Sequence, residues 1–287
     1  METRTAGTLL VLASAVLFGF TPIFARLAYS EGITVNDLLF FRFLFAFIAT
    51  GAFLVSRRHL VLPGKGDVLT LFVLGIAYFL ETTLYFTSLL YTSVAVTALL
   101  LYTYPVLVTL GAFALGWEKP SRSLAMILVV ALLGLLLVAN PSGGSFGIGV
   151  MLALGSSIVY TVYILGSSRV LRRVRGDVAA FYVMGAASLS FGLNGEMRGS
   201  FHVSWGWLGW LWILLISLLS TVIAVMAFFV GVSRIGPSRS ALISLVEPVT
   251  SVLVALAIFG NAMTTSQWLG GVLILAAAAA TVRYTNP

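Results

Sequence analysis

The sequence predicts an all-α integral membrane protein whose ten transmembrane helices form two inverted-topology repeats of five helices each. The first observation is composition: the 287 residues are 60% hydrophobic and only 9% charged, whereas a soluble domain carries about 25% charged residues. The second is that the apolar runs are long and continuous, unlike the short alternating strands of a barrel. The third is that a proline-broken apolar run occurs twice, at Pro105 and at Pro248, 143 residues apart.

Ten apolar runs are each near the length of ~20 residues that crosses a bilayer. The first begins at about Gly7 and is long enough to span, so we expect a retained helix and not a cleaved signal. The seventh is the weakest, because its apolar stretch Val178–Leu193 is short and contains two glycines. The expected spans are 7–27, 36–55, 68–88, 94–116, 123–139, 147–168, 178–193, 208–231, 240–260 and 266–284.

The polar stretch at 140–145 divides the chain into two halves of five spans each. We expect a first five-helix repeat over residues 1–139 and a second over residues 146–287. Because five is odd, the second repeat must enter the membrane in the opposite direction from the first. A transporter built in this way has its substrate site near the midplane, between the halves.

The basic residues predict the orientation. The segments on one side of the membrane hold thirteen of the 16, the opposite loops hold only Arg198, and Arg26 and Arg42 lie in or at the edge of spans. By the positive-inside rule both termini are cytoplasmic. Four tryptophans at 205–212 crowd the outer entry of the eighth span, and we interpret them as an aromatic belt. The thirteen are Arg4, Arg57, Arg58, Lys65, Lys119, Arg122, Arg169, Arg172, Arg173, Arg175, Arg234, Arg239 and Arg283.

Pro105 and Pro248 interrupt the fourth span of each half. A proline inside a helix has no N–H and crowds the carbonyl four residues back, so the carbonyls of Leu101 and Ser244 lose their normal partners. In a bilayer such groups are tolerated where protein or a water-filled cavity satisfies them. We therefore expect Pro105 and Pro248 to act as hinges for opposite gates.

Polar and aromatic residues on several spans predict a lined cavity. Those of the third span are spaced i, i+3, i+4 and i+7, which places them on one helical face. Each tyrosine taken singly is more typical of helix packing, but the set together has the aromatic walls and sparse polar groups of a small-molecule site. The residues expected to bind substrate are Tyr78, Glu81, Thr82, Tyr85, Tyr102, Tyr160, Tyr163 and Glu247.

Glu81 and Glu247 are ionisable groups inside spans, which are functional-site hypotheses by default. Arg42 enters its span at a depth similar to that of Glu81, so we expect the two to pair. The alternatives are that Arg42 snorkels outward or pairs with Asp37. Glu247 has no cationic partner in its own helix, and it has the freed carbonyl region or a tyrosine hydroxyl to bond. Its role is structural or functional with equal weight.

Several functions are disfavoured by the sequence. There is no cysteine, and neither His59 nor His202 has a companion at ligand spacing, so we expect no metal and no cofactor. No nucleotide-binding loop or nucleophile–base arrangement is visible, which argues against an enzyme. The net charge of +7 comes from loops between spans and indicates topology and a lipid bilayer, not a nucleic-acid partner. A monomer is the working expectation.

The sequence resembles the ten-helix branch of the drug/metabolite transporter superfamily, whose repeat is called the EamA domain. The likeness covers essentially the whole chain, and it departs from the family pattern at Gly260-Asn261, where the ninth helix usually ends in Gly-Glu. The motifs that carry it are Leu17–Pro22, Arg42–Ala46, Tyr91–Ala95, Tyr104-Pro105 leading to Gly116-Trp117-Glu118, Ile235–Ser238 and Glu247-Pro248.

Within the family the chain is similar to bacterial exporters of aromatic amino acids. This resemblance implies a secondary transporter of the bacterial inner membrane that exports aromatic and other neutral amino acids by alternating access. An exporter of other small metabolites or cationic drugs is the alternative, since a carboxylate in a tyrosine-lined cavity can bind a cation. An intramembrane enzyme and a channel-like protein are the rivals from other classes.

Overall fold

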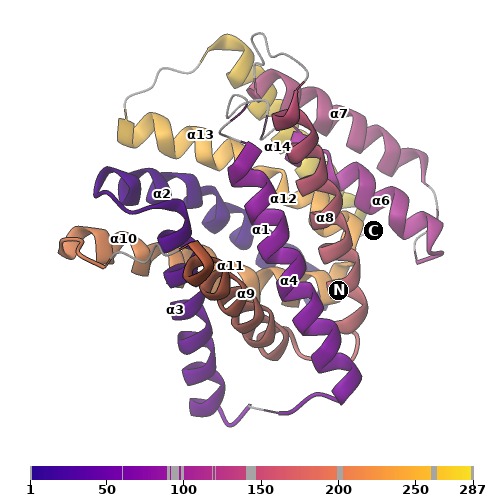
Figure 1. Ribbon diagram of the computed structural model, residues 1–287. Helices are drawn as coiled ribbons and strands as arrows, with labels where there is room; N and C mark the ends of the chain where they lie inside the picture. Colours follow the sequence, from indigo (N-terminus) through magenta and orange to yellow (C-terminus); the bar gives the residue numbers. More distant parts are fainter. Residues whose placement is uncertain are drawn as a thin grey trace.

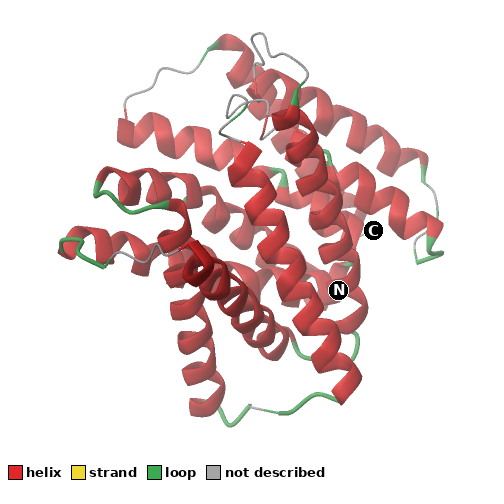
Figure 2. Cartoon of the chain, viewed as in Figure 1, coloured by secondary structure: helices red, strands yellow, loops and turns green. Residues whose placement is uncertain are grey.

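A computed structural model describes residues 2–59, 61–88, 91, 97, 100–117, 119, 121–139, 147–198, 203–259 and 264–285. Every regular element in these residues is a helix, so the predicted fold class is confirmed (Figures 1 and 2). The elements are α1 (Glu2–Gly19), α2 (Thr21–Ser30), α3 (Val35–Ser56), α4 (Lys65–Ser88), α6 (Tyr104–Ala114), α7 (Arg122–Ala139), α8 (Ile148–Val170), α9 (Gly176–Arg198), α10 (Trp207–Ser217), η1 (Leu218–Ile223), α11 (Ala224–Ile235), α12 (Pro237–Ser244), α13 (Val246–Phe259) and α14 (Thr265–Thr285).

Seven stretches of helix in the described residues are long and apolar enough to cross a membrane, and Tyr104–Ala114 of α6, Arg122–Leu137 of α7 and Thr265–Thr281 of α14 are shorter apolar stretches. The seventh span, weakest in the sequence, is the 23-residue helix α9. Its small side chains allow close packing, and most of it is buried. The expected boundary between the repeats at 140–145 lies outside the described residues, as do residues 94–96, 98 and 99 of the fourth span.

The helix pairs repeat across the two halves. The third span, α4, packs along the sixth, α8; likewise the eighth, through α11, packs along the first, α1. The second span pairs with the seventh, α3 with α9, and the fifth pairs with the tenth, α7 with α14. Exchanging the halves therefore maps each of these pairs onto another pair or onto itself, as a two-fold pseudo-symmetric fold requires.

Glycines bring some of these helix pairs into backbone contact. A Cβ on Gly134 of α7 would lie 2.8 Å from the carbonyl oxygen of Gly270 on α14. A Cβ on Gly75 of α4 would lie 2.7 Å from the carbonyl oxygen of Val183 on α9. Membrane helices lack a hydrophobic drive to associate and depend on such close approach, so these contacts fix the helices around the site described below.

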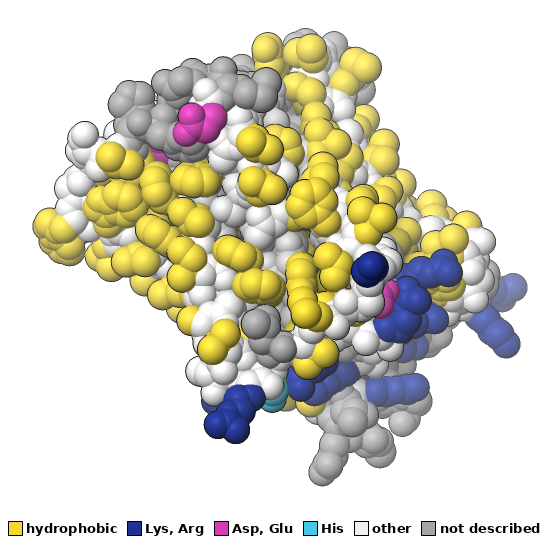
Figure 3. All heavy atoms as spheres, turned by 60° about the horizontal axis from the view of Figure 1, so that its bottom comes forward, with side chains coloured by type: hydrophobic (Ala, Val, Ile, Leu, Met, Phe, Trp, Pro, Cys, Tyr) yellow, Lys and Arg dark blue, Asp and Glu magenta, His cyan; other side chains and the backbone are white. Residues whose placement is uncertain are grey.

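The surface is divided by residue type. Hydrophobic side chains cover most of the face drawn in Figure 3, and Lys and Arg side chains gather along its lower edge. Two ion pairs lie at this basic end: Arg173 to Asp67 in the first turn of α4 at 3.0 Å, and Arg175 to Asp177 in the first turn of α9 at 2.9 Å. The hydrogen bond with Asp177 raises the pKa of Arg175 further, so this guanidinium stays charged.

Three of the four tryptophans in the predicted belt also pack against other helices. Trp205 and Trp210 pack edge-on against the ring of Phe41 on α3. Trp212 stacks on Phe24 of α2, with the ring centres 6.4 Å apart. Trp207 is 74% exposed. The other three form an aromatic cluster that holds α10 against α2 and α3, and the belt itself stays a prediction.

Candidate functional site

Tyrosines from three spans meet between the two repeats. Tyr78 of α4 stacks on Tyr163 of α8, with ring centres 5.0 Å apart and planes 13° apart. Tyr163 stacks in turn near Tyr160, at 5.8 Å. Tyr104, at the start of α6, meets Tyr160 edge-on at 4.7 Å. Of these four tyrosines, Tyr78, Tyr160 and Tyr163 are among the residues expected to bind substrate.

Tyr78, Tyr104, Tyr160 and Tyr163 are called the tyrosine ladder here. Glu81 lies beside this ladder, and both of its carboxylate oxygens accept hydrogen bonds. Ser156 of α8 donates its hydroxyl to Oε1 at 3.1 Å, and the Thr82 hydroxyl is shared between Oε2 at 3.1 Å and the carbonyl oxygen of Tyr78 at 2.8 Å. Glu81 is 7% exposed and Thr82 is 6% exposed. Because the two hydroxyls fix the carboxylate, Glu81 joins α4 to α8 across the boundary between the halves.

Glu247 is held more loosely. It is half-buried in the first turn of α13, and its carboxylate accepts a hydrogen bond from the hydroxyl of Tyr102. It also lies close enough to Glu81 and Arg42 to interact with both electrostatically. Of the two partners considered from the sequence, the structure provides the tyrosine hydroxyl. Tyr85 is half-buried and belongs to the same group, since it interacts with both carboxylates.

Arg42 does not form the ion pair expected from the sequence. It is 5% exposed on α3, and its Nε donates to the hydroxyl oxygen of Thr221 at 2.7 Å. Its Nη2 donates to the carbonyl oxygen of Ser220 at 3.4 Å. Among the described residues, no ion pair joins it to Glu81 or to Asp37, and its burial excludes snorkelling. Arg42 remains a nearby positive charge for Glu81 and Glu247.

The partner of Arg42 is a π-helical turn, which the sequence does not signal. In η1 the hydroxyl of Thr221 donates to the carbonyl of Ile216, five residues back, at 2.8 Å. A π-turn inside an α-helix displaces carbonyls from their usual i−4 partners and is frequent at functional sites. Here the displaced geometry presents the Ser220 carbonyl to the Arg42 guanidinium.

A third helix break lies in the first span, next to the π-turn. The span divides at Phe20, between α1 and α2, because Pro22 cannot continue the hydrogen-bond ladder. Ser220 donates to the carbonyl of Leu17 at 2.7 Å, and Ser251 of α13 donates to the carbonyl of Gly19 at 2.9 Å. Both donors come from the second repeat, so the freed carbonyls of the first span are satisfied across the boundary.

The two proline breaks face each other. The fourth span is interrupted at Tyr102-Thr103, before Pro105, and the ninth at Leu245, before Pro248. Thr103 donates its hydroxyl to the carbonyl of Leu100 at 2.7 Å, which satisfies one carbonyl near the break. The side chains of Tyr104 and Ser244 hydrogen-bond between the two breaks. Both interruptions therefore adjoin the tyrosine ladder and Glu247.

The resulting site combines one guanidinium, two carboxylates and aromatic surface. All eight residues predicted to bind substrate fall in it or next to it: Tyr78, Glu81, Thr82, Tyr85, Tyr102, Tyr160, Tyr163 and Glu247. It holds no cluster of three metal-ligating side chains among the described residues. The arrangement suits a small solute that carries an ammonium group and an aromatic or apolar part.

Comparisons with known proteins agree with this architecture. A model of the EamA-like transporter family matches residues 5–140 and 147–283. An uncharacterized transporter of Archaeoglobus fulgidus is 27% identical over 277 residues, covering 94% of each chain. An uncharacterized transporter of Bacillus subtilis is 26% identical over 92% of this chain and 89% of its own.

An uncharacterized inner membrane transporter of Salmonella typhimurium is 24% identical over 96% of this chain and 94% of its own. A solved crystal structure is similar with a TM-score of 0.80 at 21% identity, covering 99% of this chain and 100% of the other. At 21% identity, the similarity to the solved structure is evidence for the fold alone.

Proposed function

This chain belongs to the EamA-like transporter family, and on that basis we propose that it exports aromatic and other neutral amino acids by alternating access, as a monomer. That it is a membrane transporter of small substrates, and not an enzyme, follows from the family and from its relatives. The substrate, the direction of transport and the binding site are our proposals.

The observation that carries the substrate proposal is that Arg42, Glu247 and the tyrosine ladder lie together. Within the described part of the chain Glu247 accepts from the hydroxyl of Tyr102, and a carboxylate has further acceptor sites for an ammonium group. The guanidinium of Arg42 bonds Thr221, Ser220 and Tyr78, and its fork of five N–H groups leaves a donor for a carboxylate. The rings of Tyr78, Tyr163 and Tyr160 stack on one another, and in this proposal the aromatic side chain of the substrate extends that stack. A zwitterionic amino acid matches these three groups.

The alternative substrate class is a cationic drug or another small metabolite. Two carboxylates and one guanidinium lie at the site, so a solute with an ammonium group and no carboxylate is the main competitor. Counterflow into liposomes that contain the purified protein separates the two classes. We expect saturable uptake of radiolabelled phenylalanine that unlabelled neutral amino acids compete for, with and without a pH gradient. Uptake of quaternary amines alone would support the alternative, and uptake of neither class would refute a site of this chemistry.

The basic end of the molecule is proposed to face the cytoplasm of a bacterial inner membrane. Thirteen of the 16 Lys and Arg residues lie in segments on this side. Because the chain has no cysteine, a single introduced thiol reports its own side. We expect Ser30→Cys, at the end of α2, to react with an impermeant maleimide from outside the cell. Ser233→Cys, also exposed but at the basic end, should react only after permeabilisation. The reverse pattern would invert the proposed orientation.

The proline breaks are proposed to act as bending points for opposite gates. In an inverted repeat one half can adopt the conformation of the other, which closes one side while it opens the other. The breaks at Tyr102-Thr103 and Leu245 occupy matching positions in the halves and contact each other through Tyr104 and Ser244. Bending at one break would therefore move the residues at the other.

We expect Pro105→Ala and Pro248→Ala to slow transport without loss of folded protein. Alanine restores an N–H and favours a continuous helix, because proline costs about 3 kcal/mol in a helix interior. Each straightened helix should favour one facing state, and the two variants should favour opposite states because their helices run in opposite directions. Sided labelling of a cavity cysteine measures this. Normal transport in both variants would make the prolines packing kinks, and a shift to the same side in both would contradict opposite gates.

A further inference from the structure

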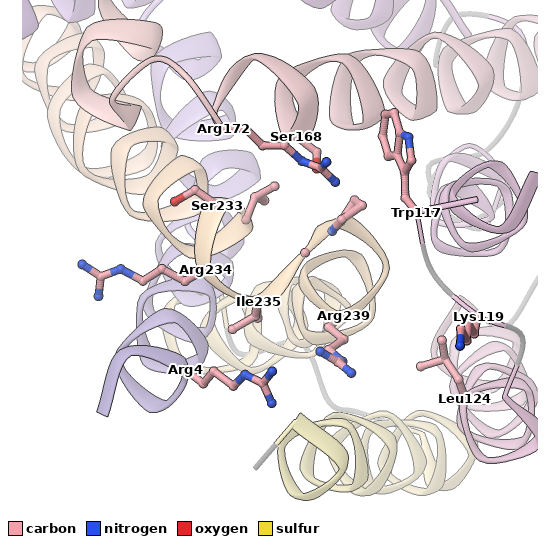
Figure 4. Close-up of a pocket in the computed structure, with 13 residues that line it drawn as sticks. Arg4, Trp117, Lys119, Leu124, Ser168, Arg172, Ser233, Arg234, Ile235 and Arg239 are labelled. Atoms are coloured by element: carbon pink, nitrogen blue, oxygen red, sulfur yellow. The ribbon is translucent and has the colours of Figure 1, made fainter. Parts of the chain in front are cut away.

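A cavity of about 430 Å³ lies at the basic end of the molecule, between helix ends of both repeats (Figure 4). Arg172 and Ser168 come from the end of α8, Arg4 from α1 and Arg239 from α12. Lys119 and Trp117 come from the segment between α6 and α7, and Arg234 points away from the rest in Figure 4. This hollow, called the basic pocket here, has the size of a small-molecule site.

Among the described residues, every charged side chain that lines the basic pocket is positive. Its lining includes five Lys and Arg side chains and no described acidic side chain. The ion pairs found in the described residues join Asp67 with Arg173, and Asp177 with Arg175 and His59, and none of them involves Arg172, Lys119 or Arg4. Glu118, next to Lys119 in the chain, lies outside the described residues. The cluster therefore produces a positive local field that favours an anion.

The backbone adds to this field. Gly236 and Pro237 line the basic pocket at the N-terminal end of α12, where no side chain caps the helix. Gly236 has φ 86°, a conformation that glycine adopts without strain, and it turns the chain from α11 into α12 there. A helix N-terminus carries partial positive charge and binds phosphate and carboxylate groups. Ser168, 5% exposed, supplies a hydroxyl in the same wall.

A second hollow of about 290 Å³ adjoins the first, lined by Arg169, Arg173 and the shared residues Arg172 and Trp117. The guanidinium of Arg172 lies over the Trp117 ring, 5.6 Å from its centre. A stacked guanidinium keeps its planar fork in a fixed orientation and can bind two oxygens of one phosphate. Arg172 therefore lines both hollows.

We propose that the basic pocket binds a phosphate group, with Arg172 as its principal ligand and Lys119 and Arg4 beside it. The group can belong to a phosphorylated solute in the cytoplasm or to the headgroup of an anionic phospholipid. Topology accounts for basic residues on this face, but it does not require them to converge on one hollow at a helix N-terminus. The proposal is independent of the substrate proposed above, because the pocket shares no residue with the tyrosine ladder.

The test measures pyrophosphate binding by calorimetry on the full chain in phosphatidylcholine nanodiscs at low salt. We expect saturable binding that Arg172→Gln weakens about tenfold, the size of one lost charge-assisted hydrogen bond, and that Lys119→Gln weakens by a smaller factor. Arg57→Gln is the matched control, because Arg57 is exposed at the same end of the molecule but does not line the basic pocket. Size-exclusion profiles confirm that each variant is folded.

A second arm identifies the source of the phosphate. If a lipid headgroup is the occupant, nanodiscs with phosphatidylglycerol should weaken pyrophosphate binding by competition, and Arg172→Gln should remove that effect. If a soluble phosphate is the occupant, phosphatidylglycerol should leave pyrophosphate affinity unchanged. No saturable binding, together with no effect of phosphatidylglycerol on the protein, would overturn the proposal. An equal loss in Arg57→Gln and Arg172→Gln would also overturn it, since it would show diffuse attraction to the whole face.

Discussion

Replacing Arg42 with glutamine should reduce transport about 10- to 100-fold, the equivalent of about 1.5–3 kcal/mol for a hydrogen bond made by a charged group. Arg42 is the positive charge near Glu81 and Glu247, and it holds the π-turn through Thr221 and the Ser220 carbonyl. Glutamine removes the charge and shortens the side chain. Both the hydrogen bonds to the π-turn and the positive charge near the two carboxylates are therefore lost. Initial rates of counterflow measure the effect.

Arg26→Gln is the matched control for this prediction. Arg26 also lies within a span, but it is exposed and stacks over the ring of Phe259 at 4.4 Å, away from the central group. We expect it to retain most of the transport rate. Arg42→Lys should recover part of the loss, because lysine keeps the charge but lacks the planar fork that reaches two acceptors. Equal rates in Arg42→Gln and Arg26→Gln would remove Arg42 from the site.

Replacing Glu247 with glutamine should weaken substrate affinity about 10- to 100-fold, because a charged acceptor for the ammonium group is lost. Glutamine has nearly the same shape and still accepts from Tyr102 through its amide oxygen, so the fold should survive. The affinity is measured as the half-saturating concentration in counterflow. The loss should be larger for substrates with an ammonium group than for analogues without one.

Glu81→Gln should behave differently, and the contrast tests the assignment. Oε1 of Glu81 accepts from Ser156, and Oε2 shares the Thr82 hydroxyl with the carbonyl of Tyr78, so glutamine places an amide N–H₂ where one of these hydroxyls donates. We expect a lower thermal stability of the detergent-solubilised protein and a smaller change in substrate affinity. If Glu81→Gln lost substrate affinity while Glu247→Gln kept it, Glu81 and not Glu247 would be the acceptor for the ammonium group.

Much of the architecture could be predicted because it depends on local properties of the chain. Long apolar runs predict spans, and a proline predicts a break near its own position, as at Pro105 and Pro248. The i, i+3, i+4, i+7 pattern placed Tyr78, Glu81 and Thr82 on the buried face of α4. These inferences need no knowledge of which helices become neighbours.

The parts that sequence reasoning missed depend on packing between distant segments. The π-turn at Leu218–Ile223 has no composition signal, and its geometry is fixed by contacts of Thr221 and Ser220 with other helices. Arg42 was assigned to Glu81 by depth alone, which leaves the rotation of α3 undetermined. The packing of Trp205, Trp210 and Trp212 against α2 and α3 likewise depends on which helices become neighbours. Pro22 was visible in the sequence but lay within a motif used only for resemblance.

We propose that substrate binds between the two repeats, beside Glu247 and the tyrosine ladder, and alkylation of a single cysteine at Tyr85 tests this most directly. Tyr85 is half-buried and interacts with both carboxylates, and the absence of native cysteine makes the introduced thiol the only target. If the account is right, a transported amino acid slows alkylation of Tyr85→Cys, with half-protection at its half-saturating transport concentration, and leaves Ser30→Cys unaffected. An alkylation rate at Tyr85→Cys that stays constant up to saturating substrate would contradict it.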